Sequence, residues 1–322
     1  MISRYTGPLP EPLGFFLVPD YSMMAFFSAV EPLRIANRCA GEPLFRWQTI
    51  TADGEPVAAS NGMRLMPDSA MENVHDLPTL LVCSAFDVEA HAGRRVLTWL
   101  NRLDATGTVL GGMDTGAFLL ARAGLLHGHR VTMHWESLPA FREAFPDIET
   151  SDELYEMDER RFSCAGGAAA MDMMLDIIAQ RHGAELALAV SEQLIHARIR
   201  SRRAHQRIAL AARLGIHNRR LLRAVELMER NLEQPLPPAE LADRCDISLR
   251  QLQRLFAEQL ETTPSAYYQR LRLERAQQLL QQTDMTVLGV GLACGFTSAS
   301  SFSRAYRSHF DRPPREDRRW LK

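Results

Sequence analysis

The spacing of hydrophobic residues changes along the chain. In the first part, continuous apolar runs such as 13–19 (LGFFLVP) and 77–86 (LPTLLVCSAF) alternate with longer segments of helical period, of which 21–39 is the first. Continuous apolar runs are typical of strands that are buried on both faces of a parallel sheet. Strands that alternate with helices predict an α/β domain, in which helices flank a parallel sheet.

The same alternation predicts the other elements of this part. Further strands are expected at 45–52, 108–112, 129–135 and 161–167, and further helices at 94–107, 114–126, 138–145 and 168–180. A last helix at 184–199 either packs on this domain or pairs with a second copy of the chain. Residues 200–218 are basic and weakly patterned, so we interpret them as a linker.

From residue 219 onward the apolar period is helical, and one pattern occurs twice. In the first copy Pro237 and Pro238 start a short helix, and after a turn Ser248 is the expected N-cap of a second helix at 249–260. The second copy repeats the turn, the cap and the second helix. From the caps onward the copies are fifty residues apart, because five residues of the first match five of the second: Ser248, Leu252, Arg254, Phe256 and Pro264 match Ser298, Phe302, Arg304, Tyr306 and Pro314.

The second helix of each copy has an apolar face and a polar face. The expected packing residues are Leu249, Leu252, Leu255, Phe256 and Leu260 in the first copy, and Ala299, Phe302, Ala305, Tyr306 and Phe310 in the second. The polar faces carry Arg250, Gln253 and Arg254, and Ser300, Arg304 and Arg307. A proline-free and glycine-free helix at 265–282, roughly 25 Å long at about 1.5 Å per residue, separates the copies. Such a strut suits two recognition helices about one DNA turn apart, roughly 34 Å.

This arrangement resembles the AraC/XylS family of transcription regulators. The resemblance covers about the last hundred residues, through YYQRLRLERAQQLL, ACGFTSASSFSRAYRSHF and the closing Pro-Pro. It implies an all-α domain with two helix-turn-helix units that binds double-stranded DNA. The expected DNA contacts are Ser248, Arg250, Gln253, Arg254, Ser298, Ser300, Arg304 and Arg307. Gly289 and Gly291, where the family carries β-branched residues and alanine, and Asp311, where it prefers glycine, depart from the pattern.

Composition and charge support this division. A chain of 322 residues with 46% hydrophobic content can form two domains with their own cores. From Arg200 onward there are 22 Lys and Arg against 13 Asp and Glu, whereas the preceding part has 15 against 26. The basic part suits a polyanion. The sequence has no apolar run of membrane-spanning length and no signal pattern, so we expect a cytoplasmic protein. The five scattered cysteines favour neither disulfides nor a metal site, and no cofactor is expected.

The most informative stretch of the first part is 108–136 (TVLGGMDTGAFLLARAGLLHGHRVTMHWE). A strand ends in glycines, Asp114 sits on a tight turn, and an Ala/Leu-rich helix begins, which is the geometry that holds a nucleophile in many enzymes. With SAVEPLRIAN, MHWE and SCAGGAAAMDMM, this stretch resembles the class I glutamine amidotransferase-like domain, in its PfpI-like branch, over roughly 13–181.

The enzymes of that branch carry cysteine at the elbow, where this sequence carries Asp114. A carboxylate is a much weaker nucleophile than a thiolate, so we expect no catalytic residue and no enzyme activity. Cys83 and Cys164 lie near strand ends, but neither is on a strand-to-helix elbow. Asp114 is then a ligand contact, with its negative charge stabilised by the N-terminus of the following helix.

The resemblance also implies which side chains surround Asp114: Glu31 from the first helix, and His134, Trp135 and Glu136 from the strand after the elbow helix. Carboxylates and an aromatic wall favour an organic cation. The same motifs resemble regulators of arginine, glycine betaine and carnitine catabolism, which implies an amino-acid-derived cation or zwitterion as effector. In the alternative, Asp114 only caps its helix, Glu31 pairs with an arginine and Trp135 lies in the core.

Together these patterns predict a ligand-sensing domain at 1–183, a helix and linker at 184–218, and a DNA-binding domain at 219–322. We expect a transcription activator that contacts RNA polymerase, and a homodimer follows in the alternative in which 184–199 pairs with a second copy. One competing interpretation is an amidase or deglycase that the C-terminal helices tether to DNA. Another is a nucleoid-type DNA binder without a ligand.

Overall fold

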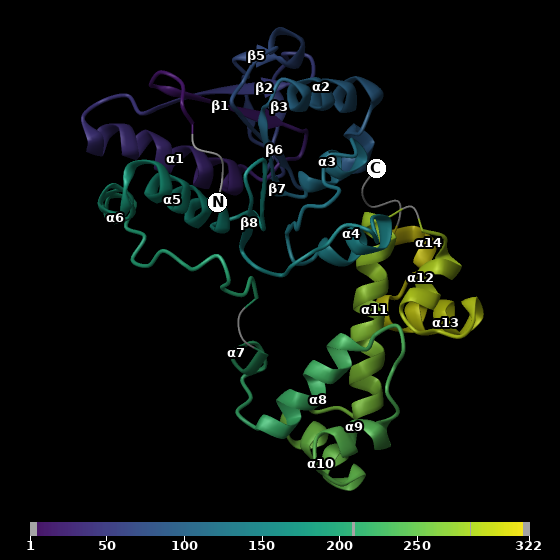
Figure 1. Ribbon diagram of the computed structural model, residues 1–322. Coiled ribbons are helices and arrows are strands. Elements are labelled where there is room, and N and C mark those ends of the chain that lie inside the picture. The colour runs from purple at the N-terminus through teal and green to yellow at the C-terminus, as the bar shows by residue number, and fades with distance from the viewer. Residues whose placement is uncertain (1–4, 208–209, 284, 318–322) are drawn as a thin grey trace. The chain divides into compact units, whose positions relative to one another are not determined.

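The computed structural model describes residues 5–207, 210–283 and 285–317, and its contacts divide the chain into two units, 1–206 and 207–322 (Figure 1). The outer ends of the predicted domains, at 1–4 and 318–322, and residues 208–209 of the predicted linker lie outside the described residues. The domain limits at 183 and 218 stay a prediction.

The first unit is built on a seven-stranded sheet in the order β5-β2-β1-β6-β7-β9-β8. The strands are β1 (Glu11–Leu17), β2 (Phe45–Thr51), β5 (Ser69–Ala70), β6 (Thr79–Ser84), β7 (Val109–Asp114), β8 (Tyr155–Met157) and β9 (Arg161–Cys164). Every neighbouring pair is parallel except β8 with β9, which is antiparallel. The predicted parallel sheet is thus confirmed, with an antiparallel edge strand that the apolar pattern did not indicate.

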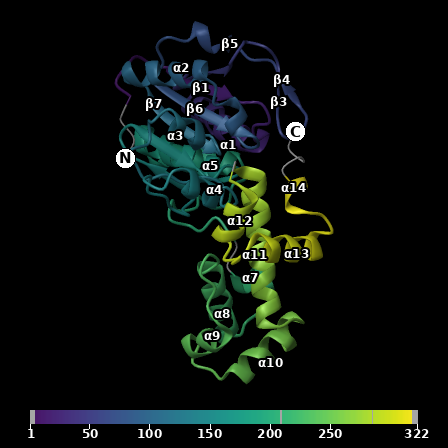
Figure 2. The ribbon, with the colours of Figure 1, turned by 90° about the vertical axis from the view of Figure 1, so that its right-hand side faces the viewer.

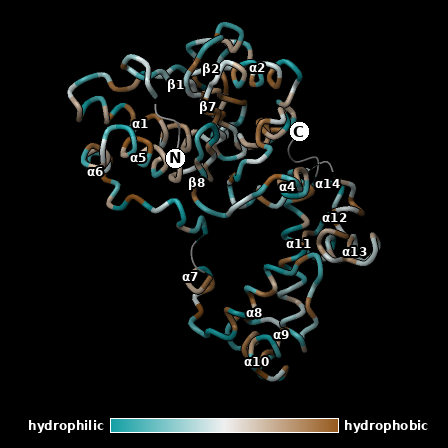
Figure 3. Tube along the Cα trace, viewed as in Figure 1, coloured by the Kyte–Doolittle hydropathy of each residue, from teal (hydrophilic) through white to brown (hydrophobic). Residues whose placement is uncertain are grey.

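Helices cover both faces of this sheet (Figure 1). On one face lie α1 (Met23–Ala40), α5 (Ala169–His182) and α6 (Ala184–Gln193), and on the other lie α2 (Arg94–Ala105) and α3 (Ala117–Arg122), with α4 (Leu138–Ala144) further along the chain. Successive residues of β1 show why the strand is apolar throughout: the Phe15 ring packs on Phe26 of α1, and the Phe16 ring packs on Trp99 of α2. In Figure 3 the central strands run mainly in the hydrophobic colours.

Short elements complete the first unit. They are the hairpin of β3 (Val57–Ala58) and β4 (Arg64–Leu65) and the 3-10 helices η1 (Met71–Asn73) and η2 (Val88–His91). Of the two roles considered for the helix after residue 183, the structure shows packing on this unit, because Ala187 and Val190 of α6 are buried in its core. Among the helices of the described residues, none is long and apolar enough to cross a membrane.

The strand expected at 129–135 does not form, and that prediction is wrong. Val131 makes only an isolated bridge to Thr150, and the backbone N–H of Thr132 donates to the side-chain oxygen of Ser163, 2.8 Å away, instead of to a strand. The edge of β9 that β7 leaves free pairs with β8, so the segment 129–137 remains a loop.

The second unit contains the two predicted helix-turn-helix motifs (Figure 2). Its helices are α7 (Leu210–Leu214), α8 (Arg219–Arg230), α9 (Pro238–Arg244), α10 (Leu249–Leu260), α11 (Pro264–Gln282), α12 (Val287–Ala293), α13 (Ala299–Phe310) and α14 (Pro314–Asp317). Both predicted N-caps are confirmed: Ser248 Oγ accepts from the N–H of Gln251, and Ser298 Oγ accepts from the N–H of Ser301, each at 3.2 Å. Leu249 and Ala299 were expected to pack but are exposed; each is the first residue of its helix, α10 or α13.

The turns of the two motifs have the same backbone hydrogen bond and the same left-handed position. In the first turn the N–H of Ile247 donates to the carbonyl of Ala242 at 3.1 Å, and in the second the N–H of Phe296 donates to that of Gly291 at 2.8 Å. Asp246 (φ 55°) and Gly295 (φ 74°) take the left-handed position. Thr297 is one extra residue in the second turn, which explains why the fifty-residue register holds only from the caps onward.

Helix α11 fastens the second motif through Arg272. Its guanidinium donates to the carbonyls of Cys294 (2.7 Å) and Gly295 (2.6 Å), and it lies 4.1 Å above the centre of the Phe296 ring. These contacts satisfy carbonyls at the end of α12 that its own backbone leaves free. Asp311, at the end of α13, adopts the left-handed conformation (φ 55°) for which the family uses glycine, and aspartate tolerates it better than most side chains.

Gly295→Ala is expected to destabilise the second unit. The glycine has a positive φ, and a Cβ there would lie 2.7 Å from the carbonyl oxygen of Leu232. We expect the free energy of unfolding to fall by about 1–3 kcal/mol, measured by urea titration with circular dichroism. As a control, Gly289→Ala lies inside α12, where a Cβ would meet only the side chains of Thr286 (3.2 Å) and Met285 (3.6 Å), and it should change the free energy of unfolding by at most about 1 kcal/mol. Equal transitions for both variants would show that the turn is not under this constraint.

Candidate functional site

The carboxyl end of β7 forms a tight elbow at Asp114. Asp114 has a left-handed backbone (φ 58°), and α3 begins three residues later. A Cβ at Gly116 would lie 2.1 Å from the carbonyl oxygen of Val82, so only glycine lets the turn lie this close to β6. The elbow therefore projects one side chain, that of Asp114, from the end of the sheet, where open α/β folds bind their ligands.

The Asp114 carboxyl lies in an environment that disfavours its charge. Burial and the nearby Glu136 carboxylate raise the pKa of Asp114 from 3.8 to about 7. The side chain also lies against Gly166, where a Cβ would come within 2.7 Å of its Oδ2. The expected stabilisation of this negative charge by the N-terminus of α3 stays a prediction; α3 has only six residues, with Gly116 as its N-cap. Desolvation and like-charge repulsion outweigh so short a dipole.

His134 and Glu136 belong to the loop 129–137 and face each other. His134 Nδ1 lies 3.9 Å from Glu136 Oε2, and burial lowers the pKa of His134 although Glu136 opposes this change. The Trp135 ring lies 5.5 Å from the His134 ring, and all three side chains are half-buried. The structure thus places Glu136 near Asp114, His134 beside Glu136, and Trp135 beside His134.

Glu31 lies on α1 and forms an ion pair with Arg34 one turn later, with Arg34 Nε 2.9 Å from Glu31 Oε2. The side chains of Glu31 and Arg34 are 36% and 51% exposed. Exposed pairs of this kind contribute little to stability, because water and salt screen them. A ligand that recruits Glu31 therefore has only a weak pair to break.

The two cysteines at this edge of the sheet are buried thiols. Burial raises the pKa of Cys83 well above its ordinary value and that of Cys164 to about 12. Backbone N–H groups of Gly166 and Asp114 approach the Cys164 sulfur, but they do not offset the burial. At neutral pH both sulfurs are protonated, and a thiol is a poor nucleophile.

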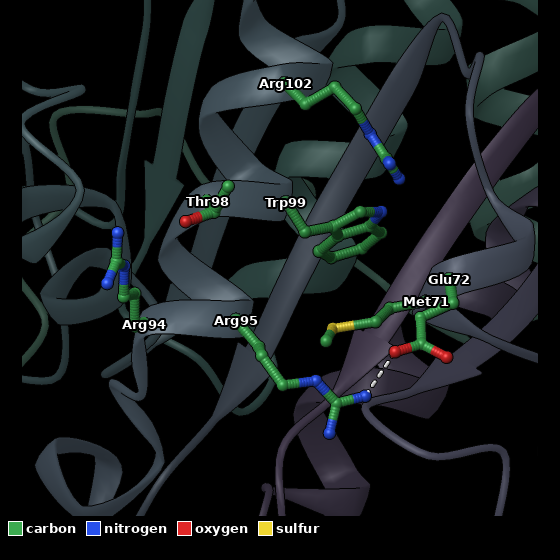
Figure 4. Close-up of a pocket in the computed structure, with 7 residues that line it drawn as sticks. All are labelled: Met71, Glu72, Arg94, Arg95, Thr98, Trp99 and Arg102. Carbon is green, nitrogen blue, oxygen red and sulfur yellow. Dashed lines mark hydrogen bonds and ion pairs between the residues drawn. The ribbon is translucent and has the colours of Figure 1, made fainter.

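A hollow of about 360 Å³ lies between α2 and η1 in the first unit, away from the Asp114 elbow in the sequence (Figure 4). Trp99 and Met71 form its floor, Arg95 pairs with Glu72, and Arg102 donates to the Val74 carbonyl at 3.2 Å. With Arg94 also on its lining, its charge is positive, the opposite of the Asp114 site. No periodic pattern or motif indicates this hollow, because its lining comes from two separate segments, 71–72 and 94–102.

The eight residues predicted to contact DNA are all exposed in the described structure. On α10, Arg254 lies 3.7 Å from Glu258 in an exposed ion pair. On α13, Ser300, Arg304 and Arg307, with Ser303, line a surface hollow of about 490 Å³. Both helices thus present arginine and small polar side chains on the face opposite their buried apolar face, as base-reading helices do.

The fold and these two motifs define a DNA-binding transcription regulator with an α/β domain on its N-terminal side. A helix-turn-helix family model matches residues 241–319, and that of the DJ-1/PfpI family matches residues 22–180. The HTH-type transcriptional regulator CdhR of Pseudomonas aeruginosa is 49% identical over 96% of this chain and 92% of its own length. GbdR of the same organism is 43% identical over 96% of this chain and 84% of its own length. ArgR of that organism is 39% identical over 96% of this chain and 93% of its own length.

Among solved structures, an AraC family transcriptional regulator from Pseudomonas putida matches 57% of this chain and 100% of its own, with 28% identity and a TM-score of 0.52. This chain belongs to the family of AraC-type HTH transcriptional regulators that carry a DJ-1/PfpI domain. It is a sequence-specific DNA-binding regulator of transcription.

The raised pKa of Asp114 predicts how the stability of the first unit depends on pH. Because the folded value, about 7, lies above the ordinary 3.8, the native state holds this proton more tightly than the unfolded chain does. The free energy of unfolding of the first unit should therefore fall as pH rises from about 4 to about 7. Asp114→Asn should remove this slope and, at pH 8, stabilise the unit by roughly 2 kcal/mol.

Urea titrations followed by tryptophan fluorescence measure this effect, since Trp47, Trp99 and Trp135 lie in the first unit. The exposed Asp147→Asn is the control and should leave the slope unchanged. If the free energy of unfolding changes with pH equally in wild type and Asp114→Asn between pH 4 and 7, this result would contradict the raised pKa.

A second prediction concerns the recognition helices. Arg254→Ala and Arg304→Ala should each weaken binding to a specific DNA site by about 1–3 kcal/mol and relax the base preference at one position. Mobility-shift titrations on the selected site and on singly mutated sites measure both effects. Arg213→Ala, whose guanidinium pairs with Glu229 at 2.9 Å, is the control. Unchanged affinity and preference for both test variants would show that these faces do not read bases.

Proposed function

We propose that the first unit binds a small organic cation or zwitterion derived from an amino acid, such as arginine, glycine betaine or carnitine, and that binding alters transcription. The observation that carries this proposal is the Asp114 carboxyl at the elbow, with Glu136 as a second carboxyl beside it. Burial first, and repulsion from Glu136 second, raise the pKa of Asp114, and a bound cation would offset both by stabilising the ionised carboxylate.

The neighbouring side chains support the same class of ligand. Trp135 supplies an aromatic face beside His134, and Glu31 completes the set that the family resemblance implies. A quaternary ammonium or guanidinium group gains from both carboxylates and an aromatic ring. An anionic metabolite suits the positive hollow at α2 better than the Asp114 site.

We also propose that the first unit has no enzymatic activity, against the alternative of an amidase or deglycase tethered to DNA. The elbow carries a carboxyl, and the thiols of Cys83 and Cys164 are protonated near neutral pH. The proposal further places the protein in the cytoplasm as an activator that contacts RNA polymerase. Pairing of two chains through the outer side of α6, where Leu188 is 58% exposed, belongs to the same proposal.

Calorimetry on the full chain with arginine, glycine betaine, carnitine and sarcosine tests the effector class. We expect at least one of them to bind, with affinity rising about tenfold from pH 6 to pH 8, because Asp114 must be ionised in the complex and its pKa is about 7. Asp114→Asn and Glu136→Gln should each weaken binding by about 1.5–3 kcal/mol.

The control for this experiment is Arg102→Ala in the α2 hollow, which should leave cation binding unchanged. The DNA footprint should respond to the same compound at the concentration where it binds. Binding of an anionic metabolite that depends on Arg102, with no heat from any cation, would overturn the proposed effector class.

A further inference from the structure

Residues 194–206, called the strap below, follow α6 without forming a helix or a strand of the sheet. The buried Asp172 of α5 holds the first part of the strap: His196 Nε2 lies 3.0 Å from Asp172 Oδ1, and the Arg200 guanidinium lies 2.7 Å from Oδ2. The backbone N–H of Arg200 also donates to Asp172 at 2.7 Å. A fully buried carboxylate with three donors makes this end of the strap a fixed point.

The second part of the strap lies along the segment that leads into β8. The backbone N–H of Leu154 donates to the Arg202 carbonyl at 3.0 Å, and His205 makes an antiparallel bridge to Glu153. The strap ends at Gln206, which is also the last residue of the first unit. The described part of the next unit begins with Arg207, so any change in the strap arrives directly at the connection to the DNA-binding unit.

Gln206 inserts its amide between two segments of the first unit. Its Nε2 lies 3.0 Å from Thr132 Oγ1, 3.0 Å from the Met133 carbonyl and 2.9 Å from the Glu153 carbonyl. Its Oε1 is buried without a hydrogen-bond partner among the described residues. The two N–H donors of the amide thus share three acceptors, and the amide oxygen accepts no hydrogen bond from the described residues. The hydrogen bonding of Gln206 in this position is therefore incomplete.

Two of the three residues that Gln206 contacts, Thr132 and Met133, belong to the loop 129–137 of the Asp114 site. Met133 precedes His134, and Thr132 is joined to Ser163, which precedes Cys164 and therefore lies beside the elbow. This loop lacks the ladder of backbone bonds that a strand would supply, so it can move more readily than its neighbours in the sheet.

We propose that the strap couples the charge state of the Asp114 site to the connection with the DNA-binding unit, and that Gln206 is the coupling residue. The proposal rests on the proposed function of this site. A cation that draws Glu136 toward Asp114 moves the backbone of the loop at Met133. Gln206 then loses or re-forms its three contacts, while Asp172 holds the other end of the strap. Gln206 is a positioning residue and does not contact the ligand.

The test uses the full chain as wild type, Asp114→Asn, Gln206→Leu and the double variant. Hydrogen exchange of the peptides that cover 196–206 and affinity for a selected DNA site are measured for each. Asp114→Asn removes a charge without any ligand, and we expect it to change strap exchange by at least about threefold and DNA affinity by about fivefold or more. In the Gln206→Leu background the same substitution should change DNA affinity by less than about twofold.

Gln193→Leu is the matched control, because Gln193 is exposed at the end of α6, and it should preserve the full Asp114→Asn effect. Gln206→Asn keeps the amide on a shorter side chain and should restore part of the coupling, which loss of packing alone does not predict. Circular dichroism melts confirm that each variant is folded. Equal Asp114→Asn effects with and without Gln206→Leu, or strap exchange that ignores Asp114→Asn, would overturn the proposal.

Glycine betaine, added to the same proteins, separates this proposal from the proposed function. Failure of glycine betaine and the other cations to bind, together with an Asp114→Asn effect that depends on Gln206, refutes the effector class and supports the strap. Binding of glycine betaine that changes DNA affinity equally in wild type and Gln206→Leu supports the effector class and refutes the strap.

Discussion

A carboxyl group held at the end of a buried strand, with another carboxyl as its charged neighbour, is the constraint on which the first unit depends. The left-handed turn at Asp114 fixes where that group lies, and Gly116 lets the turn approach β6. Burial and Glu136 then raise the pKa of Asp114 to about 7. The elbow that positions a nucleophile in an enzyme here positions a group whose charge is costly, and this is the basis of the proposal that the site binds a cation.

The second unit solves a different problem, which is to hold two similar motifs in one register. The first motif packs around an apolar core that includes Phe256 and Tyr267. In the second motif the buried rings of Phe296, Phe302 and Tyr306 pack on one another. Polar contacts add to this core: Arg272 binds the carbonyls at the end of α12, and the buried Asp317 pairs with Arg312 at 2.6 Å and accepts from Tyr306. Duplicated sequence thus forms the same backbone turn, while unlike contacts from α11 and α14 support it.

The proposed regulation requires that a change at the Asp114 site reach the DNA-binding unit. The basic and weakly patterned segment 200–218 was interpreted as a linker. Its residues Arg200, Arg202 and Gln206 nevertheless make specific contacts with the first unit. A segment that is held by side chains instead of a backbone ladder can exchange one set of contacts for another at small cost. Its position between the site and Arg207 is what makes it a candidate for transmission.

The sequence by itself determined the features that depend on local spacing. These are the strands buried on both faces, the two serine-capped recognition helices and the elbow at Asp114, since apolar period, capping and turn chemistry act within a few residues. Only the tertiary structure decided that 129–137 is a loop, that Leu249 is exposed, that the charge of Asp114 is disfavoured and that Gln206 reaches Met133. Each of these depends on which distant segment lies nearby, on strand-edge competition or on burial, and the spacing of residues along one chain does not encode those contacts directly.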